Sequence, residues 1–255
     1  MHPLVDAIRR HVTAGATLHA DDAPVPVLTA GNGQTKTGRL WTDVRDDRPS
    51  ASCAPPAVWS VDTPDRNGIH PQTHLANFAG ILQADAYAGF NLVYESGPVQ
   101  EAALWTHTRR ECQDLHVTHA TATTTEALPR LSEAYDSGNQ IRGKQPDICR
   151  QICSQQALPQ LSGFQAWLRA RLPTLSAKPD TRRAINYALN QWQALRLYCH
   201  DGVADIDNNA AERALRSVAL GTKNFASMGA DGSGERTAAM TRCSTTKTCS
   251  ISWVK

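Results

Sequence analysis

Residues 80–85, Gly-Ile-Leu-Gln-Ala-Asp, form a short apolar run that ends in an acidic residue. A run of this length and composition is typical of a buried β-strand. Residues 71–78 before it and residues 86–95 after it have helical character, and residues 99–105 have the pattern of a further strand. Because strands that alternate with helices pair in parallel through crossovers, this part of the chain predicts an α/β sheet.

Three more strands are expected upstream of this alternation. The expected elements are a helix over residues 2–14 and strands over residues 17–28, 38–44 and 57–61. The first strand contains Pro24 and Pro26, which require a sheet edge or an irregularity because proline donates no hydrogen bond to a ladder. We therefore predict a mixed sheet of three antiparallel strands followed by two parallel ones, with the first and fourth strands as neighbours. This is the element order of the ribonuclease H-like fold.

The pattern becomes helical after the fifth strand. We expect helices over residues 107–119, 125–141, 147–172 and 181–200. The last has one apolar stripe, which indicates core packing rather than a ligand site. The expected domains are a first part of the sheet core over residues 1–106, an all-α insertion over 107–200, a return to the core with a catalytic helix over 201–240, and a divergent, disordered tail over 241–255.

The return to the core begins with residues 207–216, Asp-Asn-Asn-Ala-Ala-Glu-Arg-Ala-Leu-Arg. The Asp-Asn-Asn triplet is typical of a helix N-cap, and Asp207 is expected to act as such a cap. Glu212 then lies early in the helix, where an acidic residue is common on an ordinary surface helix. Two other acidic residues, Asp21 and Asp85, belong to the first and fourth strands. A helix laid across these strands would bring the three carboxylates together.

Three converging carboxylates repel one another, which raises at least one pKa. Divalent cations relieve this repulsion, and carboxylate oxygens suit Mg²⁺ or Mn²⁺. Two such ions would activate a nucleophilic oxygen and stabilise the leaving oxygen in a phosphoryl transfer. The set Asp21, Asp85 and Glu212 is therefore the candidate metal-binding and catalytic triad. Asp22, beside Asp21, is a neighbour without an assigned role.

The overall composition excludes a bulk polycation and an extracellular disulfide framework. The chain has 255 residues and a formal net charge of +2, so contacts with nucleic acid would depend on local basic patches. Its seven cysteines are odd in number and irregular in spacing, which favours reduced thiols. Neither a signal peptide nor an apolar run long enough to cross a membrane is recognisable. We expect a soluble cytoplasmic protein.

Five ordered motifs resemble the DDE transposases of the insertion sequence 66 group, and the resemblance extends over roughly residues 3–240. The motifs are Leu-His-Ala-Asp-Asp-Ala-Pro-Val-Pro-Val-Leu (18–28), Lys-Thr-Gly-Arg-Leu-Trp (36–41), Leu-Gln-Ala-Asp-Ala-Tyr-Ala-Gly-Phe (82–90), Trp-Thr-His-Thr-Arg-Arg (105–110) and Asp-Asn-Asn-Ala-Ala-Glu-Arg (207–213). Five matches in the same order are far more specific than one.

The resemblance implies a ribonuclease H-like core with a helical insertion, and Asp21, Asp85 and Glu212 as the triad that binds two Mg²⁺ or Mn²⁺ ions. It also implies nucleic-acid contacts at five basic residues, which are His107, Arg109, Arg110, Arg213 and Arg216. The implied partners are DNA, as element ends and target, a homo-oligomer and other transposition proteins; no membrane is implied.

The chain also departs from the group's pattern. Members usually begin further upstream, and residues 241–255 diverge as a shifted reading frame would produce. The resemblance therefore implies a member truncated at both ends. Two functions stay open: metal-dependent DNA strand cleavage and strand transfer in transposition, or an inactive remnant that binds only DNA or an intact transposase subunit. A carboxylate-pair glycosidase is disfavoured by the strand context of the acidic residues.

Overall fold

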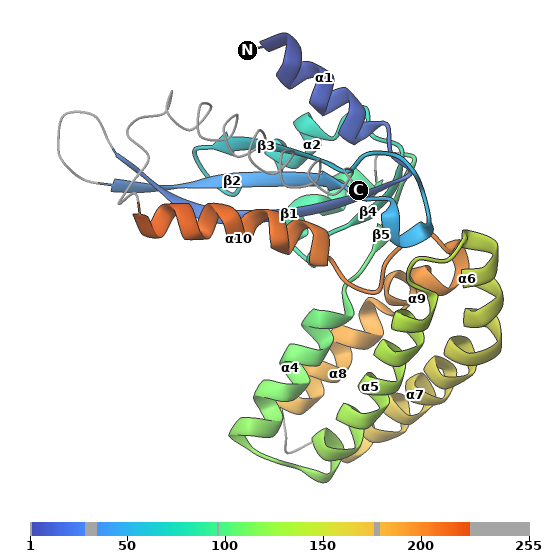
Figure 1. Ribbon diagram of the computed structural model, residues 1–255. Coiled ribbons are helices and arrows are strands. Elements are labelled where there is room, and N and C mark those ends of the chain that lie inside the picture. Colours follow the sequence, from blue (N-terminus) through green and yellow to red (C-terminus); the bar gives the residue numbers. More distant parts are fainter. Residues whose placement is uncertain (1, 29–34, 96, 176–178, 225–255) are drawn as a thin grey trace. The chain divides into compact units, whose positions relative to one another are not determined.

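The computed structural model describes the backbone of residues 2–28, 35–95, 97–175 and 179–224 (Figure 1). Residues 241–255, the predicted tail, lie outside the described residues. The chain divides into two compact units. The first, which we call the sheet unit, comprises residues 1–47, 53–101 and 208–255, and the second, the helical unit, comprises residues 48–52 and 102–207.

The described part of the sheet unit contains a five-stranded sheet of order β3-β2-β1-β4-β5. The strands are β1 (Thr17–Leu28), β2 (Thr35–Arg45), β3 (Ala57–Thr63), β4 (Gly80–Gln83) and β5 (Val99–Ala102). β2 pairs antiparallel with both β1 and β3, whereas β1 pairs in parallel with β4. The predicted mixed sheet and the predicted neighbourhood of the first and fourth strands are therefore confirmed.

The two prolines of β1 lie in a part of the strand that is hydrogen-bonded to a neighbouring strand on one side only. β1 pairs with β4 only over Thr17–His19, but with β2 along Thr35–Val44. Pro24 and Pro26 therefore belong to a stretch of β1 that pairs on one side only. A strand can hold proline there because no ladder hydrogen bond is required on the free side.

Helices cover both faces of the sheet. On one face lie α1 (His2–Thr13), α2 (Ile69–His74), the short 3₁₀ turn η2 (Ala88–Phe90) and α3 (Asn91–Glu95). Apolar side chains of α1, η2 and α3, together with Leu75 and Phe78 after α2, join the large core cluster of the sheet. On the other face lies α10 (Asn209–Asn224), whose Ala211 and Ala214 pack against β2 and β3 (Figure 1).

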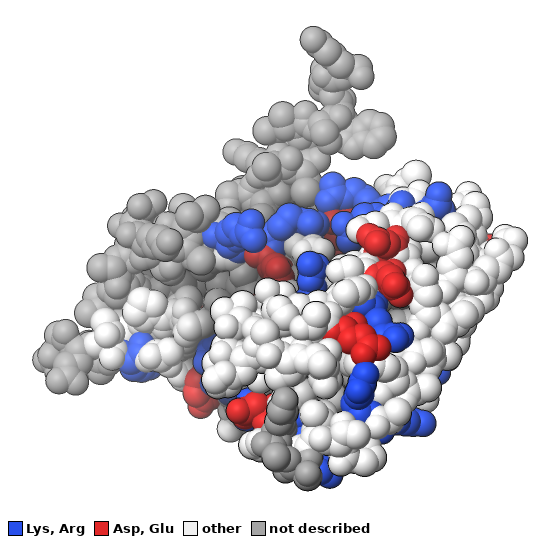
Figure 2. All heavy atoms as spheres, turned by 90° about the horizontal axis from the view of Figure 1, so that it is seen from below, with Lys and Arg blue, Asp and Glu red and all other residues white. Residues whose placement is uncertain are grey.

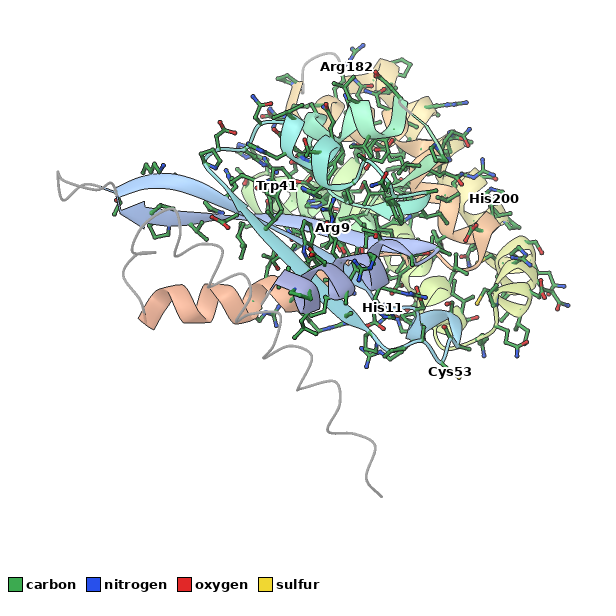
Figure 3. All side chains as sticks on the ribbon, turned by 90° about the horizontal axis from the view of Figure 1, so that it is seen from above. Arg9, His11, Trp41, Cys53, Arg182 and His200 are labelled. Atoms are coloured by element: carbon green, nitrogen blue, oxygen red, sulfur yellow. The ribbon has the colours of Figure 1, made fainter. Side chains whose placement is uncertain are left out.

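Arg9 of α1 also reaches the layer above the sheet. Its guanidinium lies 5.3 Å from the centroid of the Trp59 ring and donates to the His74 carbonyl oxygen over 3.1 Å. Figure 3 labels Arg9 together with Trp41 of β2 on this side of the sheet unit. The helix therefore packs through cationic as well as apolar contacts.

The helical unit contains six α-helices among the described residues. They are α4 (Trp105–Thr118), α5 (Ala122–Ile141), α6 (Pro146–Ile152), α7 (Leu158–Arg171), α8 (Pro179–Asn190) and α9 (Trp192–Asp201). Shorter helical segments are η1 (Arg48–Ser50), the π turn η3 (Cys153–Ala157) and η4 (Leu172–Leu175). The expected helix over 147–172 is therefore interrupted by a π turn, and the expected helix over 181–200 is broken at Gln191.

Two sequence-based boundaries were wrong. The helix expected over residues 71–78 is α2, Ile69–His74, and the strand expected to reach residue 105 ends at Ala102. Trp105 instead begins α4, with its ring fully buried beside the rings of Phe164 and Trp192. An apolar run does not reveal whether it is buried by a sheet or by helices, and here tertiary packing decided between them.

Candidate active site

Asp21 lies in β1, and Asp85 lies two residues after Gln83, where β4 ends. The parallel ladder of β1 and β4 pairs His19 with Gln83, and each aspartate follows its paired residue by two positions. Because side chains alternate across a strand, a step of two returns to the same face of the sheet. The pairing of β1 with β4 therefore brings these two carboxylates together although 64 residues separate them.

Asn208 fixes the start of α10 on β1. Its side-chain Nδ2 donates to the Ala20 carbonyl oxygen over 2.8 Å, and its Oδ1 lies 3.2 Å from the ring Nδ1 of His19. Both Asn208 and His19 are buried. The Asn208 carbonyl oxygen in turn accepts from the Glu212 backbone N–H over 3.1 Å. This anchor places Glu212, in the first turn of α10, on the face of the sheet that carries Asp21.

The three acidic side chains are near enough to interact electrostatically. Burial raises the pKa of Asp21 to about 6, a backbone hydrogen bond from Asp22 opposes this rise, and the charges of Asp85, Asp22 and Glu212 add to it. The hydrogen bond runs from the Asp22 N–H to Asp21 Oδ1 over 2.8 Å. Asp21 is therefore the carboxylate whose ionisation the site most disfavours.

Two arginines hold Asp22, which is the buried neighbour of Asp21. Its side chain is only 1% exposed, and its Oδ2 accepts from Arg39 over 2.9 Å. Its Oδ1 accepts from Nε and Nη2 of Arg66 over 3.0 and 2.8 Å. Asp22 is thus a structural carboxylate that is fully neutralised by cations, in contrast to Asp21.

Arg66 also contacts the candidate triad, a role that sequence reasoning missed. Its Nη2 donates to Asp85 Oδ2 over 3.1 Å, and its guanidinium lies 4.0 Å from the centroid of the Tyr87 ring. The Tyr87 hydroxyl donates to the Arg66 carbonyl oxygen in a short hydrogen bond. Arg66 belongs to a polar loop after β3, and no local pattern distinguishes it from a surface arginine.

The chemistry of this donor set fits a hard divalent cation. Arg39 and Arg66 contact Asp22 and Asp85, and the charges of Asp85, Asp22 and Glu212 act on Asp21. Four ionised carboxylates and two guanidinium groups leave two negative charges. Carboxylate oxygens with a surplus of negative charge are the ligands that Mg²⁺ and Mn²⁺ prefer. In the described residues, however, no three acidic, histidine or cysteine side chains are grouped closely enough to hold an ion. The side chains would have to move to do so.

The basic residues expected to contact nucleic acid are exposed, with one exception. On α10, Arg213 and Arg216 are exposed, and Arg213 lies 3.9 Å from Asp46. On α4 of the helical unit, Arg109 and Arg110 are exposed, whereas His107 is half-buried. Figure 2 shows that basic and acidic side chains are interspersed on the face seen from below. Contact of these residues with DNA stays a prediction.

Asp207 does not cap α10, contrary to the prediction. Its Oδ1 accepts from the Thr106 backbone N–H over 2.9 Å and from the Tyr135 hydroxyl over 3.1 Å. Thr106 lies in the first turn of α4, so Asp207 satisfies a free donor of a helix that begins about a hundred residues earlier. Asp207 therefore stabilises the helical unit rather than the helix that carries Glu212.

Comparison with known proteins identifies the family of this chain. The profile of the transposase IS66 family matches residues 1–236. The chain belongs to the transposase IS66 family. This match extends over both units and includes every residue of the candidate triad, and it confirms the resemblance inferred from the five motifs.

Two similar proteins of Sinorhizobium fredii are described only as uncharacterised proteins. The protein y4hP of Sinorhizobium fredii is 34% identical over 260 residues, which cover 96% of this chain and 47% of the relative. The protein y4qI of the same organism is 31% identical over 239 residues, which cover 91% of this chain and 44% of the relative. This IS66-family chain thus spans about half the length of the curated relatives it matches. No helix in its described part is long and apolar enough to cross a membrane.

Proposed function

We propose that this chain is the catalytic domain of a DDE-type transposase and performs metal-dependent DNA strand cleavage and strand transfer. In this proposal its mixed sheet is a ribonuclease H-like core, and Asp21, Asp85 and Glu212 hold two Mg²⁺ or Mn²⁺ ions. The observation that carries the proposal is the convergence of three acidic side chains in an IS66-family chain: the charges of Asp85 and Glu212 reach Asp21, whose pKa burial and these charges raise to about 6. A protein gains nothing structurally from gathering repelling carboxylates, whereas a cation site requires them.

The bound ions would supply a nucleophilic oxygen and stabilisation of the leaving oxygen in phosphoryl transfer. The residues of the chain would provide the rest. The β1–β4 ladder orients Asp21 and Asp85, and Asn208 orients Glu212 through α10. Arg213 and Arg216, exposed on the same helix, are suited to bind DNA phosphates close to the triad.

Nicking of supercoiled plasmid DNA tests this proposal without knowledge of the element ends. We expect nicking in the presence of Mn²⁺, loss of nicking in EDTA, and a loss of at least about a hundredfold in Asp85→Asn and Glu212→Gln, because each variant removes a charged ligand. Asp114→Asn, which neutralises an exposed carboxylate on α4, is the matched control and should nick normally.

The same assay separates the enzyme from the non-catalytic alternative. DNA binding in a gel-shift assay, with no nicking at any Mn²⁺ concentration and no difference between the parent protein and Asp85→Asn, would favour a protein that only binds DNA. Nicking that persists in Asp85→Asn and Glu212→Gln would show that the triad is assigned wrongly.

A further inference from the structure

Arg66 is the residue of the sheet unit that links a structural carboxylate to a member of the candidate triad. Its Nη2 lies 2.8 Å from Asp22 Oδ1 and 3.1 Å from Asp85 Oδ2. The side chain of Asp22 is 1% exposed, whereas those of Arg66 and Asp85 are 34% and 27% exposed. The two contacts are therefore unequal: the one with Asp22 is sheltered from water, and the one with Asp85 is not.

The position of Arg66 is set by several contacts other than the one with Asp85. Nε and Nη2 both donate to Asp22 Oδ1, and the guanidinium lies against the Tyr87 ring. The Tyr87 hydroxyl holds the Arg66 backbone. Arg66 would thus keep its place if Asp85 turned away. A guanidinium held in this way can donate a hydrogen bond to a nearby carboxylate and balance its charge, even if that carboxylate changes position.

Both oxygens of Asp85 are engaged in this arrangement. Oδ1 accepts from the Tyr87 backbone N–H over 3.2 Å, and Oδ2 accepts from Arg66. Asp21 Oδ1 likewise accepts from the Asp22 N–H. A cation that takes Asp85 Oδ2 as a ligand must therefore displace the hydrogen bond from Arg66.

We infer that Arg66 is a built-in counter-cation of the carboxylate site, which holds Asp85 in the metal-free protein and releases it to a divalent ion while remaining bound to Asp22. Arg66 is then a positioning residue that sets the affinity for metal and limits repulsion among the carboxylates before the metal arrives. The inference rests on the proposed function, because it takes Asp85 as a metal ligand.

Arg39 provides a matched control for this role. It contacts the other oxygen of Asp22 over 2.9 Å and carries the same charge, but it has no described contact with Asp85. Replacement of either arginine by glutamine removes one positive charge beside Asp22. Only the replacement of Arg66 also frees Asp85 Oδ2. A difference between the two variants therefore reports the contact with Asp85 rather than the change in net charge.

Titration calorimetry with Mn²⁺ on the full chain tests the inference. We expect Arg66→Gln to bind Mn²⁺ about fivefold more tightly than the parent protein, because a partly exposed ion pair changes an equilibrium constant by at most a few-fold. We expect Arg39→Gln to change the affinity for Mn²⁺ by less than about twofold. In the background of Asp85→Asn, Arg66→Gln should lose its advantage. Arg66→Lys, which keeps the charge but not the forked donor, should lie between the parent protein and Arg66→Gln.

The outcomes distinguish this inference from the proposed function. If the parent protein binds Mn²⁺ and Arg66→Gln binds it no better than Arg39→Gln does, the counter-cation role is overturned and the metal site stands. If neither the parent protein nor Arg66→Gln binds Mn²⁺, both proposals fail. Binding by Arg66→Gln alone would support the inference directly. Should Arg66→Gln be unfolded in a thermal melt, Arg66→Lys decides, and an affinity equal to that of the parent protein counts against the role.

Discussion

The sheet unit buries carboxylates and imidazoles as well as aromatic rings, whereas the described part of the helical unit buries aromatic rings and one carboxylate. In the sheet unit, Asp43, Asp46, His19 and His74 are all buried. In the described part of the helical unit, Asp207 is the one buried acidic residue. Leaving aside tryptophan, tyrosine and cysteine, the other buried polar side chains there belong to threonine and serine. Burial of charge is costly unless it is paired, so it is kept where a function requires it.

The ion pairs of the helical unit lie at its surface. Glu126 pairs with Arg130 and Arg171, and each of the three side chains is more than a third exposed. Exposed pairs of this kind contribute little to stability. The helical unit therefore depends on apolar packing, whereas the sheet unit combines apolar packing with carboxylates that are paired with arginines. The following predictions test this contrast.

The largest expected effect is in the aromatic core of the helical unit. Trp105 is fully buried, packs beside Phe164 and Trp192, and donates from its ring nitrogen to the Leu195 carbonyl oxygen over 2.9 Å. Trp105→Ala should lower the free energy of unfolding by about 3–5 kcal/mol, as measured by urea denaturation. Val117→Ala, at a side chain that is 75% exposed, is the control. A loss below about 1 kcal/mol for Trp105→Ala would mean that this ring is not a core anchor.

A smaller, pH-dependent effect is expected at Asp43 in the sheet unit. Burial raises the pKa of Asp43 to about 8 and lowers that of His74 to about 3, so that both groups, whose Oδ2 and Nε2 are 3.5 Å apart, are uncharged at neutral pH. A folded-state pKa above the unfolded value of 3.8 makes stability fall as pH rises toward and through 8.

The variant Asp43→Asn isolates this dependence because it removes one titrating group and leaves His74 in place. The parent protein should lose about 1–2 kcal/mol of unfolding free energy between pH 6 and pH 8.5 relative to Asp43→Asn, measured by urea denaturation at both values. Equal pH profiles for the two proteins would show that Asp43 does not titrate between these pH values in the folded state, which would contradict its raised pKa.

The smallest expected effect is at Asp21, where function and stability should oppose each other. Its folded-state pKa of about 6 lies above the unfolded value of 3.8, so its contribution to stability is lost as pH rises through 6. At pH 8 and without metal, Asp21→Asn should therefore be more stable than the parent protein by about 1 kcal/mol, as seen in thermal melts. At pH 5 the gain should shrink, and added Mn²⁺ should stabilise only the parent protein. A destabilised variant at pH 8 would show that Asp21 is structural.

The sequence was a good guide to elements whose pattern is local. The expected bounds of β1, residues 17–28, agree with the observed Thr17–Leu28, because alternating apolar residues and flanking turns define a strand without distant contacts. Prediction of a sheet with the first strand beside the fourth also held. Helix α10 begins at Asn209, within the predicted Asp-Asn-Asn triplet.

The candidate site was predictable in part. Asp21, Asp85 and Glu212 were selected because acidic residues on adjacent strands and a late helix can converge, and their mutual influence on the pKa of Asp21 supports that choice. Arg66 and the anchoring role of Asn208 were not predictable. Arg66 is 44 residues from Asp22, and Asn208 is 189 residues from His19. Neither contact can therefore be recognised from a local sequence pattern.

Residue patterning alone was sufficient for the mixed sheet, for the helical character of the chain after β5 and for the family, because strand alternation, helical stripes and ordered motifs are properties of neighbouring residues. Tertiary structure alone decided that Asp207 stabilises α4 instead of its own helix, that Trp105 begins a helix instead of ending a strand, and that a guanidinium from a loop lies on Asp85. In each case the choice between partners depended on distance in space, which separation along the chain does not encode.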